Sequence, residues 1–178
     1  MFLMNYEKAC ALIRTEVSRF QVEDKAALEV CRRICDHSSR LFIIAAGRSL
    51  LMMKAFAMRM MHLGYEVHIL DEVTCPAITK QDVLIAASGS GTTAGILAKA
   101  KKAKALGAKL IVWTQSPASP MAELSDVCVN LQNHQSGQPG ASLFEQSLLL
   151  ALDAFVAAIM EDKALPPDEV YKRHANLE

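Results

Sequence analysis

The sequence has no excess of charge of either sign, because nineteen Lys and Arg residues balance nineteen Asp and Glu residues. A protein that is drawn to nucleic acid or to anionic lipid by its overall field carries a basic surplus. No uncharged apolar run reaches the roughly 18 residues of a membrane-spanning helix. The first residues also lack the order of a secretory signal. We therefore expect a cytoplasmic protein that binds neither nucleic acid nor membrane.

Aromatic residues are scarce at 6% of the chain, whereas hydrophobic residues make up 52% and methionine occurs nine times. This slight apolar surplus indicates helical faces that need a partner, so self-association is expected. The five cysteines are an odd number in varied contexts, which favours reduced thiols over a disulfide framework. Cys31 and Cys35 lie one helical turn apart, but no second Cys/His pair has ligand spacing. No metal site is expected.

Helical periodicity in the first forty residues gives way to short apolar runs that alternate with helix-length segments. The expected elements are helices 5–20 and 24–35, strand 41–46, helix 49–63, strands 65–70 and 82–87, helix 92–106, strand 109–114, short helix 120–124, strand 126–131, loop 132–140, helix 142–160 and a terminal helix that starts at Pro166-Pro167 and carries His174. Such alternation implies parallel βαβ units packed in three layers.

We therefore predict one α/β domain over residues 1–178, with a parallel sheet of about five strands flanked by helices. Two N-terminal helices occupy residues 1–39, the αβα core spans 40–160, and a helical tail covers 161–178. The sequence contains no internal repeat and no linker that would indicate a second domain.

Two serine-containing turns follow expected strands, at the places where open parallel sheets bind ligands. The first is Gly47-Arg48-Ser49, and the second runs from Ser88 through Ser90 and Thr92 to Thr93. Small residues let the backbone approach an anion, and the N–H groups at a helix start point toward it. Serine and threonine add donors without charge. The pattern favours a phosphate monoester as ligand.

The alternative is that these residues merely end strands and cap helices. One turn alone would favour that interpretation, but two turns, the second with four hydroxyls in six residues, favour anion binding. Neither turn matches a nucleotide-binding pattern: there is no Gly-x-Gly-x-x-Gly and no Gly-Lys-Ser/Thr ending.

Several motifs along the chain resemble a known family. They are Ala46-Gly47-Arg48-Ser49, the stretch from Phe56 to Gly64, Ser88-Gly89-Ser90-Gly91-Thr92, Leu143-Phe144-Glu145-Gln146 and the ending from Arg173 to Glu178. The first and third are typical of sugar isomerase (SIS) domains in general. The stretch ending at Gly64 and the Arg-His-Ala-Asn-Leu ending resemble, more narrowly, the 6-phospho-3-hexuloisomerases. The resemblance extends over essentially the whole chain.

The resemblance implies an isomerase that interconverts 3-hexulose 6-phosphate and fructose 6-phosphate through an enediolate, without metal or cofactor. It places Arg48, Ser49, Ser88, Ser90, Thr92 and Thr93 around the phosphate. It also implies Glu145 as the base and His62 and His174 as candidates for the acid or for handling hydroxyls. Members of the family are usually tetramers, so we expect a homotetramer whose site is completed by His174 or His62 of a neighbouring chain.

Other interpretations of these residues stay open. Glu145 could complement the dipole of its helix or close a capping box with Ser142. His62 and His174 could be ordinary helix and surface residues, and Arg48 could brace a subunit contact. The chain departs from the usual family motifs at Leu50 and at Gly140-Ala141. This leaves open an isomerase of another ketose or aldose phosphate, or a sensor that binds a sugar phosphate without turnover.

Overall fold

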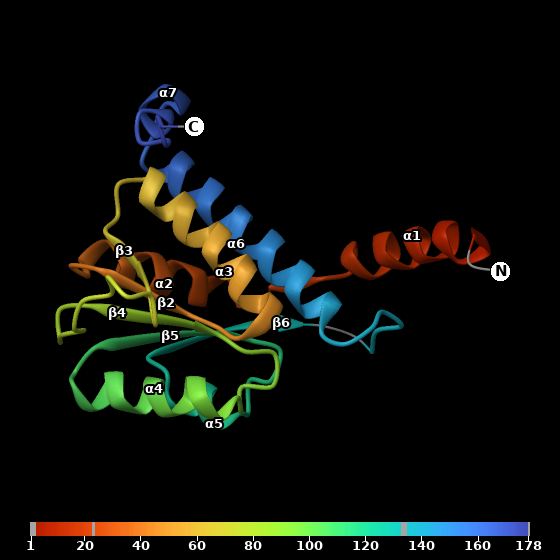
Figure 1. The fold of residues 1–178 in the computed structure, drawn as a ribbon, viewed down its shortest axis with the longest axis horizontal. Helices are drawn as coiled ribbons and strands as arrows, with labels where there is room; N and C mark the ends of the chain where they lie inside the picture. The colour runs from red at the N-terminus through yellow and green to blue at the C-terminus, as the bar shows by residue number, and fades with distance from the viewer. Residues whose placement is uncertain (1–2, 23, 133–134, 178) are drawn as a thin grey trace.

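The computed structural model describes residues 3–22, 24–132 and 135–177. Helices cover both faces of one central sheet, which gives three layers (Figure 1). The elements in chain order are α1 (Leu3–Val17), β1 (Gln21–Val22), α2 (Lys25–His37), β2 (Leu41–Ile44), α3 (Gly47–His62), β3 (Val67–Ile69), β4 (Val83–Ala87), α4 (Ala94–Ala105), β5 (Lys109–Thr114), α5 (Pro120–Leu124), β6 (Val127–Gln132), α6 (Ser142–Asp162) and α7 (Pro167–Tyr171).

The sheet has six strands in the order β1-β6-β5-β4-β2-β3. Strands β2 to β6 pair in parallel, as the alternation of strands and helices predicts. The sequence analysis missed β1, which pairs antiparallel with the end of β6 through Gln21 and Gln132. Two residues are too few to show the period-2 alternation by which a strand is recognised. The fold is therefore the expected three-layer α/β arrangement with one added edge strand.

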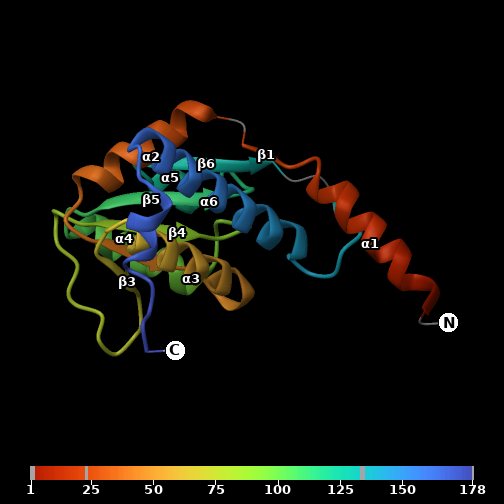
Figure 2. The same ribbon diagram turned by 90° about the horizontal axis from the view of Figure 1, so that it is seen from above.

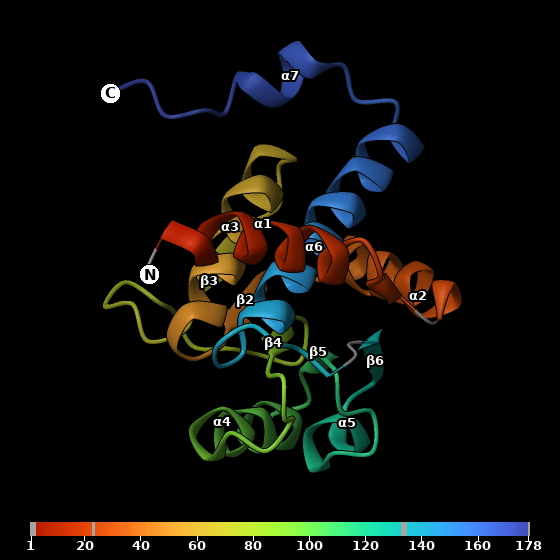
Figure 3. The same ribbon diagram turned by 90° about the vertical axis from the view of Figure 1, so that its right-hand side faces the viewer.

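Alternate residues of the parallel strands enter two separate cores. Ile43, Ile85 and Trp113 face the core that includes residues of α2, α3 and α6. Their neighbours Phe42 and Leu84 face the core beneath α4 and α5. Both faces of these strands are buried, which explains why the strands read as continuous apolar runs rather than as alternating ones. Figure 3 shows the sheet between the two helical layers.

Helix α6 has 21 residues, and its length and apolar composition alone would allow it to cross a membrane. Within the protein, 56% of its most apolar window is buried. Its Leu148, Leu152 and Ile159 belong to the core that also contains residues of α3. This is the burial pattern of a core helix. The helix lies where the sequence analysis expects one, over residues 142–160, and extends two residues further.

Helix α1 projects away from the sheet (Figures 1 and 2), and its Leu12 and Ile13 are exposed. Its inner end is tied to the loop before α6. Glu16 accepts hydrogen bonds from Ser136 Oγ at 2.6 Å, from Gly137 N at 2.7 Å and from a side-chain amide in the same loop. The bond from Ser136 is the largest of the effects that lower the pKa of Glu16. This contact anchors the loop that leads into the site.

The terminal helix α7 begins after Pro166, as expected, but the prediction that it carries His174 is wrong. The helix ends at Tyr171 and His174 lies in the bend that follows. A turn and a bend follow Tyr171, and the tail is held against the end of α3 by Arg173 instead of continuing the helix. The His174 ring instead stacks on His62 at the end of α3, with ring centroids 5.3 Å apart.

Candidate functional site

A pocket of about 500 Å³ lies at the carboxyl ends of β2 and β4, where the strand order reverses. Such a switch point in a parallel sheet leaves a crevice between loops that leave the sheet in opposite directions. The pocket receives residues from the two serine turns, from the end of β5 and from the start of α6. Its lining residues are Ala46, Gly47, Arg48, Ser49, Ala87, Ser88, Gly89, Ser90, Thr93, Ile96, Gln115, Ala141, Phe144 and Glu145.

The loop after β4 is built around the Ser88 side chain, which is buried. Its Oγ accepts a hydrogen bond from Gly91 N at 3.1 Å and lies 3.0 Å from Thr93 Oγ1. Ser90 Oγ accepts hydrogen bonds from the backbone N–H and the hydroxyl of Thr92. The hydroxyls of this loop thus order the backbone, and Ser88, Ser90 and Thr93 also line the pocket.

The same loop is fastened to β5 and α5 through its glycines. The Gly89 carbonyl accepts hydrogen bonds from Thr114 Oγ1 at 3.1 Å and from Ser116 Oγ at 3.0 Å. Gly91 has a φ of +63°, and a Cβ atom there would lie 1.9 Å from Ser119 Oγ. Only glycine fits this position, because the backbone is left-handed and the space is already filled.

Glu145 lies in the first turn of α6 and is buried. Its Oε2 lies 3.1 Å from Arg48 Nε, so that an ion pair spans the pocket from α6 to α3. Among the described residues, Oε2 accepts no hydrogen bond. The Arg48 contact is therefore an ion pair without hydrogen-bond alignment. Arg48 also donates from Nη1 to Ser142 Oγ at 3.2 Å.

The capping box between Ser142 and Glu145 does not form. Ser142 is the first residue of α6, and its N-cap residue, Ala141, makes no side-chain cap. The Ser142 hydroxyl donates to Pro139 O at 2.7 Å and accepts from Arg48. Glu145 keeps a place at the positive end of the helix dipole, but its carboxylate is directed to Arg48.

The pocket brings together six of the nine residues that the sequence analysis singled out. Arg48, Ser49, Ser88, Ser90, Thr93 and Glu145 all line it. Thr92 does not line it and instead bonds Ser90 at its rim. The sequence analysis missed Gln115 and Phe144. Gln115 follows β5 directly, so its place after a parallel strand was the signal that could have indicated it.

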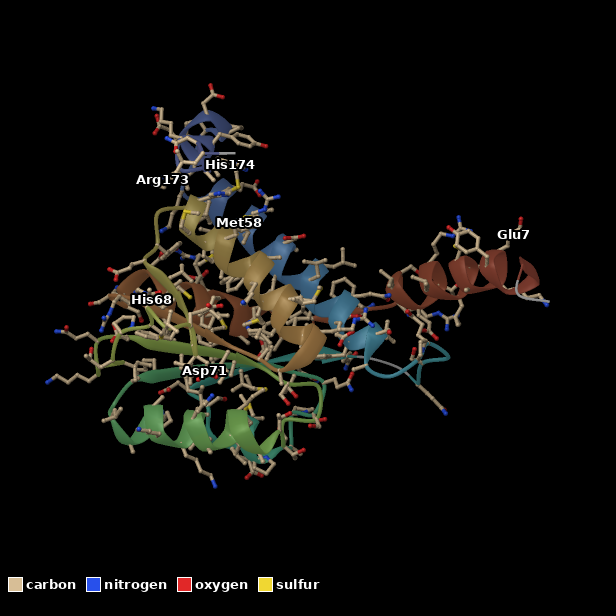
Figure 4. All side chains as sticks on the ribbon, viewed as in Figure 1. Glu7, Met58, His68, Asp71, Arg173 and His174 are labelled. Atoms are coloured by element: carbon tan, nitrogen blue, oxygen red, sulfur yellow. The ribbon has the colours of Figure 1, made fainter. Side chains whose placement is uncertain are left out.

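His62 and His174 do not reach the pocket of their own chain. Helix α3 has 16 residues, so its ends lie about 22 Å apart, with the pocket at Gly47 and His62 at the other end. Figure 4 shows His174 and Arg173 at the same end of the molecule as α7. Arg173 Nη1 donates to the His62 carbonyl at 3.3 Å, which helps to hold the tail there.

Burial lowers the pKa of His62 below its ordinary value of 6.5, and the nearby His174 and Arg59 lower it further. The unfolded chain therefore binds this proton more readily than the folded chain does. The stability that depends on neutral His62 is fully present above about pH 6.5 and is lost as the pH falls toward the lowered pKa.

We expect the Tm of the protein to fall between pH 7.5 and 5.5, and to fall less in the His62→Gln variant. Thermal denaturation at both pH values, followed by circular dichroism, measures the difference. His37→Gln, at an exposed helix end, is the control and should keep the pH dependence of the unchanged protein. An equal fall of Tm in His62→Gln would contradict the role of His62.

The described part of the chain contains no group of three or more His, Cys, Asp or Glu side chains placed to hold a metal ion. The pocket places a possible anion-binding loop, the loop after β4, beside one carboxylate, that of Glu145. Backbone N–H groups and hydroxyls of the loop after β4 can bind a phosphate, and Glu145 can exchange a proton with a bound molecule.

The SIS domain family model matches residues 35–158. The chain belongs to this family. A 3-hexulose-6-phosphate isomerase from Mycobacterium gastri is 37% identical over 177 residues, which cover 94% of this chain and 89% of the relative. A 3-hexulose-6-phosphate isomerase from Methylomonas aminofaciens is 41% identical over 152 residues, covering 82% of this chain and 84% of the relative.

Solved structures show the same fold. A protein from Methanococcus jannaschii, whose crystal structure was described as implying a 3-hexulose-6-phosphate isomerase function, superposes with a TM-score of 0.86. It is 30% identical, and the match covers 96% of this chain and 99% of that one. The family likeness therefore extends over the pocket and over both ends of the chain.

Proposed function

We propose that this protein is a sugar-phosphate isomerase that interconverts 3-hexulose 6-phosphate and fructose 6-phosphate without a cofactor. The observation that carries the proposal is a buried carboxylate, Glu145, beside an anion cradle in one pocket. The two relatives named above support the substrate, because they are called 3-hexulose-6-phosphate isomerases and are 37% and 41% identical to this chain over the matched residues.

The proposed reaction moves one proton between neighbouring carbons. Glu145 removes the proton from C2 of the 3-ketose, and the electron pair forms an enediolate across C2 and C3. The same proton, or one from solvent, is then delivered to C3, while the oxygen on C2 loses its proton and the oxygen on C3 gains one. No electrons are gained or lost overall. A base beside the carbons and an acid beside the oxygens are sufficient for this chemistry.

The phosphate is proposed to bind among Ser49, Ser88, Ser90 and Thr93, with Arg48 as the cation. The N–H groups at the starts of α3 and α4 point in the direction that favours an anion. Thr92 is proposed to act indirectly, by orienting the Ser90 hydroxyl. Anchoring the phosphate fixes the far end of the sugar and so places C2 and C3 beside Glu145.

The acid is proposed to come from a neighbouring chain in a homotetramer, through His174 or His62. Neither reaches the pocket of its own chain, and exposed apolar side chains on α3 and α6, such as Met58, Met61 and Leu150, offer a face for association. Light scattering of the purified protein should give a mass of four chains. A stable, fully active monomer would contradict this part of the proposal.

The proposed location is the cytoplasm. All five cysteines are free, as a reducing compartment would leave them.

The direct test of the function is turnover. Purified protein is incubated with 3-hexulose 6-phosphate, and fructose 6-phosphate is measured by a coupled assay. We expect conversion without added metal and in the presence of a chelator. If the protein converts only a different ketose phosphate, that compound would replace 3-hexulose 6-phosphate as the proposed substrate. The absence of turnover on every ketose phosphate tested, with binding retained, would replace the isomerase by a sugar-phosphate sensor.

A further inference from the structure

The pocket contains one positive and one negative side chain among the described residues, and the two are paired with each other. Arg48 comes from α3 and Glu145 from α6, with Nε and Oε2 3.1 Å apart. The other lining side chains come from the turn after β2, the loop after β4, the end of β5 and the starts of α4 and α6. They are apolar, hydroxyl-bearing or, at Gln115, an amide. A phosphate that enters the pocket therefore meets one cation, which a carboxylate already holds.

The two partners differ in how firmly the protein holds them. The Glu145 side chain is only 9% exposed and lies on a core helix, whereas the Arg48 side chain is 62% exposed. Arg48 can therefore swing away without disturbing the core, while Glu145 stays in place. The Nη1 bond of Arg48 to Ser142 Oγ is the other contact that the move would break.

We propose that Arg48 is a positioning residue that the phosphate of the substrate draws away from Glu145, so that phosphate binding uncovers the base. This inference rests on the proposed function. A phosphate dianion carries more charge than a carboxylate and accepts two parallel N–H bonds from a guanidinium. The Arg48–Glu145 pair lacks hydrogen-bond alignment, so the phosphate offers the guanidinium a better partner.

This exchange of partners, in which Arg48 leaves Glu145 for the phosphate, would make the enzyme selective for phosphorylated sugars. The selectivity would lie in the rate of the chemical step and not in binding alone. A sugar without phosphate leaves Arg48 on Glu145, and the guanidinium then covers the carboxylate oxygen that would take the proton. A sugar with phosphate supplies the anchor and also frees the carboxylate. The same residue thereby links recognition of the phosphate to proton abstraction.

The test uses sulfate, which resembles phosphate but does not take up protons near neutral pH. Calorimetric titration of the full chain with sodium sulfate near neutral pH measures the affinity of the pocket for the anion. We expect the contact between Arg48 and Glu145, which the anion must break, to limit the affinity of the unchanged protein.

Variants test the competition for Arg48. In Glu145→Gln sulfate should bind at least about threefold more tightly, because Arg48 no longer has a competing partner. In Arg48→Gln sulfate should bind more weakly, and adding Glu145→Gln to that variant should give no gain. Arg48→Lys should restore part of the affinity, because a lysine supplies the charge without the planar fork. A purely structural role of Arg48 would not make the gain from Glu145→Gln depend on Arg48.

Crystals grown with sulfate provide the second measurement. We expect Arg48 on the anion and its Nε more than 4 Å from Glu145 Oε2. Sulfate that binds with the ion pair intact, and no more tightly in Glu145→Gln, would overturn the exchange and leave the isomerase proposal standing. A failure of sulfate to bind would also overturn the exchange, whereas the turnover assay with 3-hexulose 6-phosphate decides the proposed function separately.

Discussion

Replacing Glu145 by glutamine is expected to lower kcat for the interconversion of 3-hexulose 6-phosphate and fructose 6-phosphate by about 10³-fold. The amide keeps the size and the buried position of the side chain but cannot accept the proton from C2. Glu145 is the one carboxylate among the described residues that line the pocket, so no neighbour there can take its place. Steady-state rates in both directions measure the loss.

Glu161→Gln is the matched control, because Glu161 lies on the same helix but at its exposed far end. This variant should keep kcat within about twofold, since surface substitutions change little. Sulfate binding by Glu145→Gln shows that the pocket is still formed. Retention of more than about a tenth of kcat in Glu145→Gln would exclude this residue as the base.

Replacing Gly91 by alanine is expected to destabilise the protein by about 2–5 kcal/mol and to abolish sulfate binding. The left-handed backbone at φ +63° costs a non-glycine residue about 1–2 kcal/mol, and overpacking costs about 1–3 kcal/mol more. The added Cβ would meet the Oγ and Cβ atoms of Ser119 at 1.9 and 2.4 Å. Relief of this clash must move the loop that carries Ser88, Ser90 and Thr93. Urea denaturation and calorimetry measure the two effects.

The control for this loop is Gly95→Ala, four residues further along the chain. Gly95 lies inside α4, and a Cβ there would meet nothing within 4 Å. Alanine is preferred to glycine in a helix by about 0.5–1 kcal/mol, so this variant should be as stable as the unchanged protein or slightly more stable. A Gly91→Ala protein as stable as Gly95→Ala would show that the loop tolerates a side chain at position 91.

The sequence predicted most helices and strands because the patterns that indicate them are local. Strand 109–114 and short helix 120–124 match β5 and α5 to the residue, and the other long elements differ by a few residues at their ends. Glycines or prolines near the ends of several helices supply these limits. The edge strand β1 was not predicted, because its pairing with Gln132 joins residues more than a hundred positions apart in the sequence.

The site was predictable as a set of turns but not as a set of contacts. Both serine turns lie at the expected strand ends, since the topology of a parallel sheet brings them together. The pairing of Arg48 with Glu145 depends on the packing of α3 against α6, which no local pattern specifies. The same is true of His62 and His174, whose stacking at the far end of α3 follows from the path of the tail.

The most direct measurement of the central claim is hydrogen exchange at C3 of fructose 6-phosphate. The purified protein is incubated with fructose 6-phosphate in deuterium oxide, and the C3 position is followed by proton NMR. Passage through an enediolate predicts that deuterium enters C3 as 3-hexulose 6-phosphate accumulates, and that Glu145→Gln slows the exchange about 10³-fold. Binding of fructose 6-phosphate without any exchange at C3 and without formation of the 3-ketose would contradict the account.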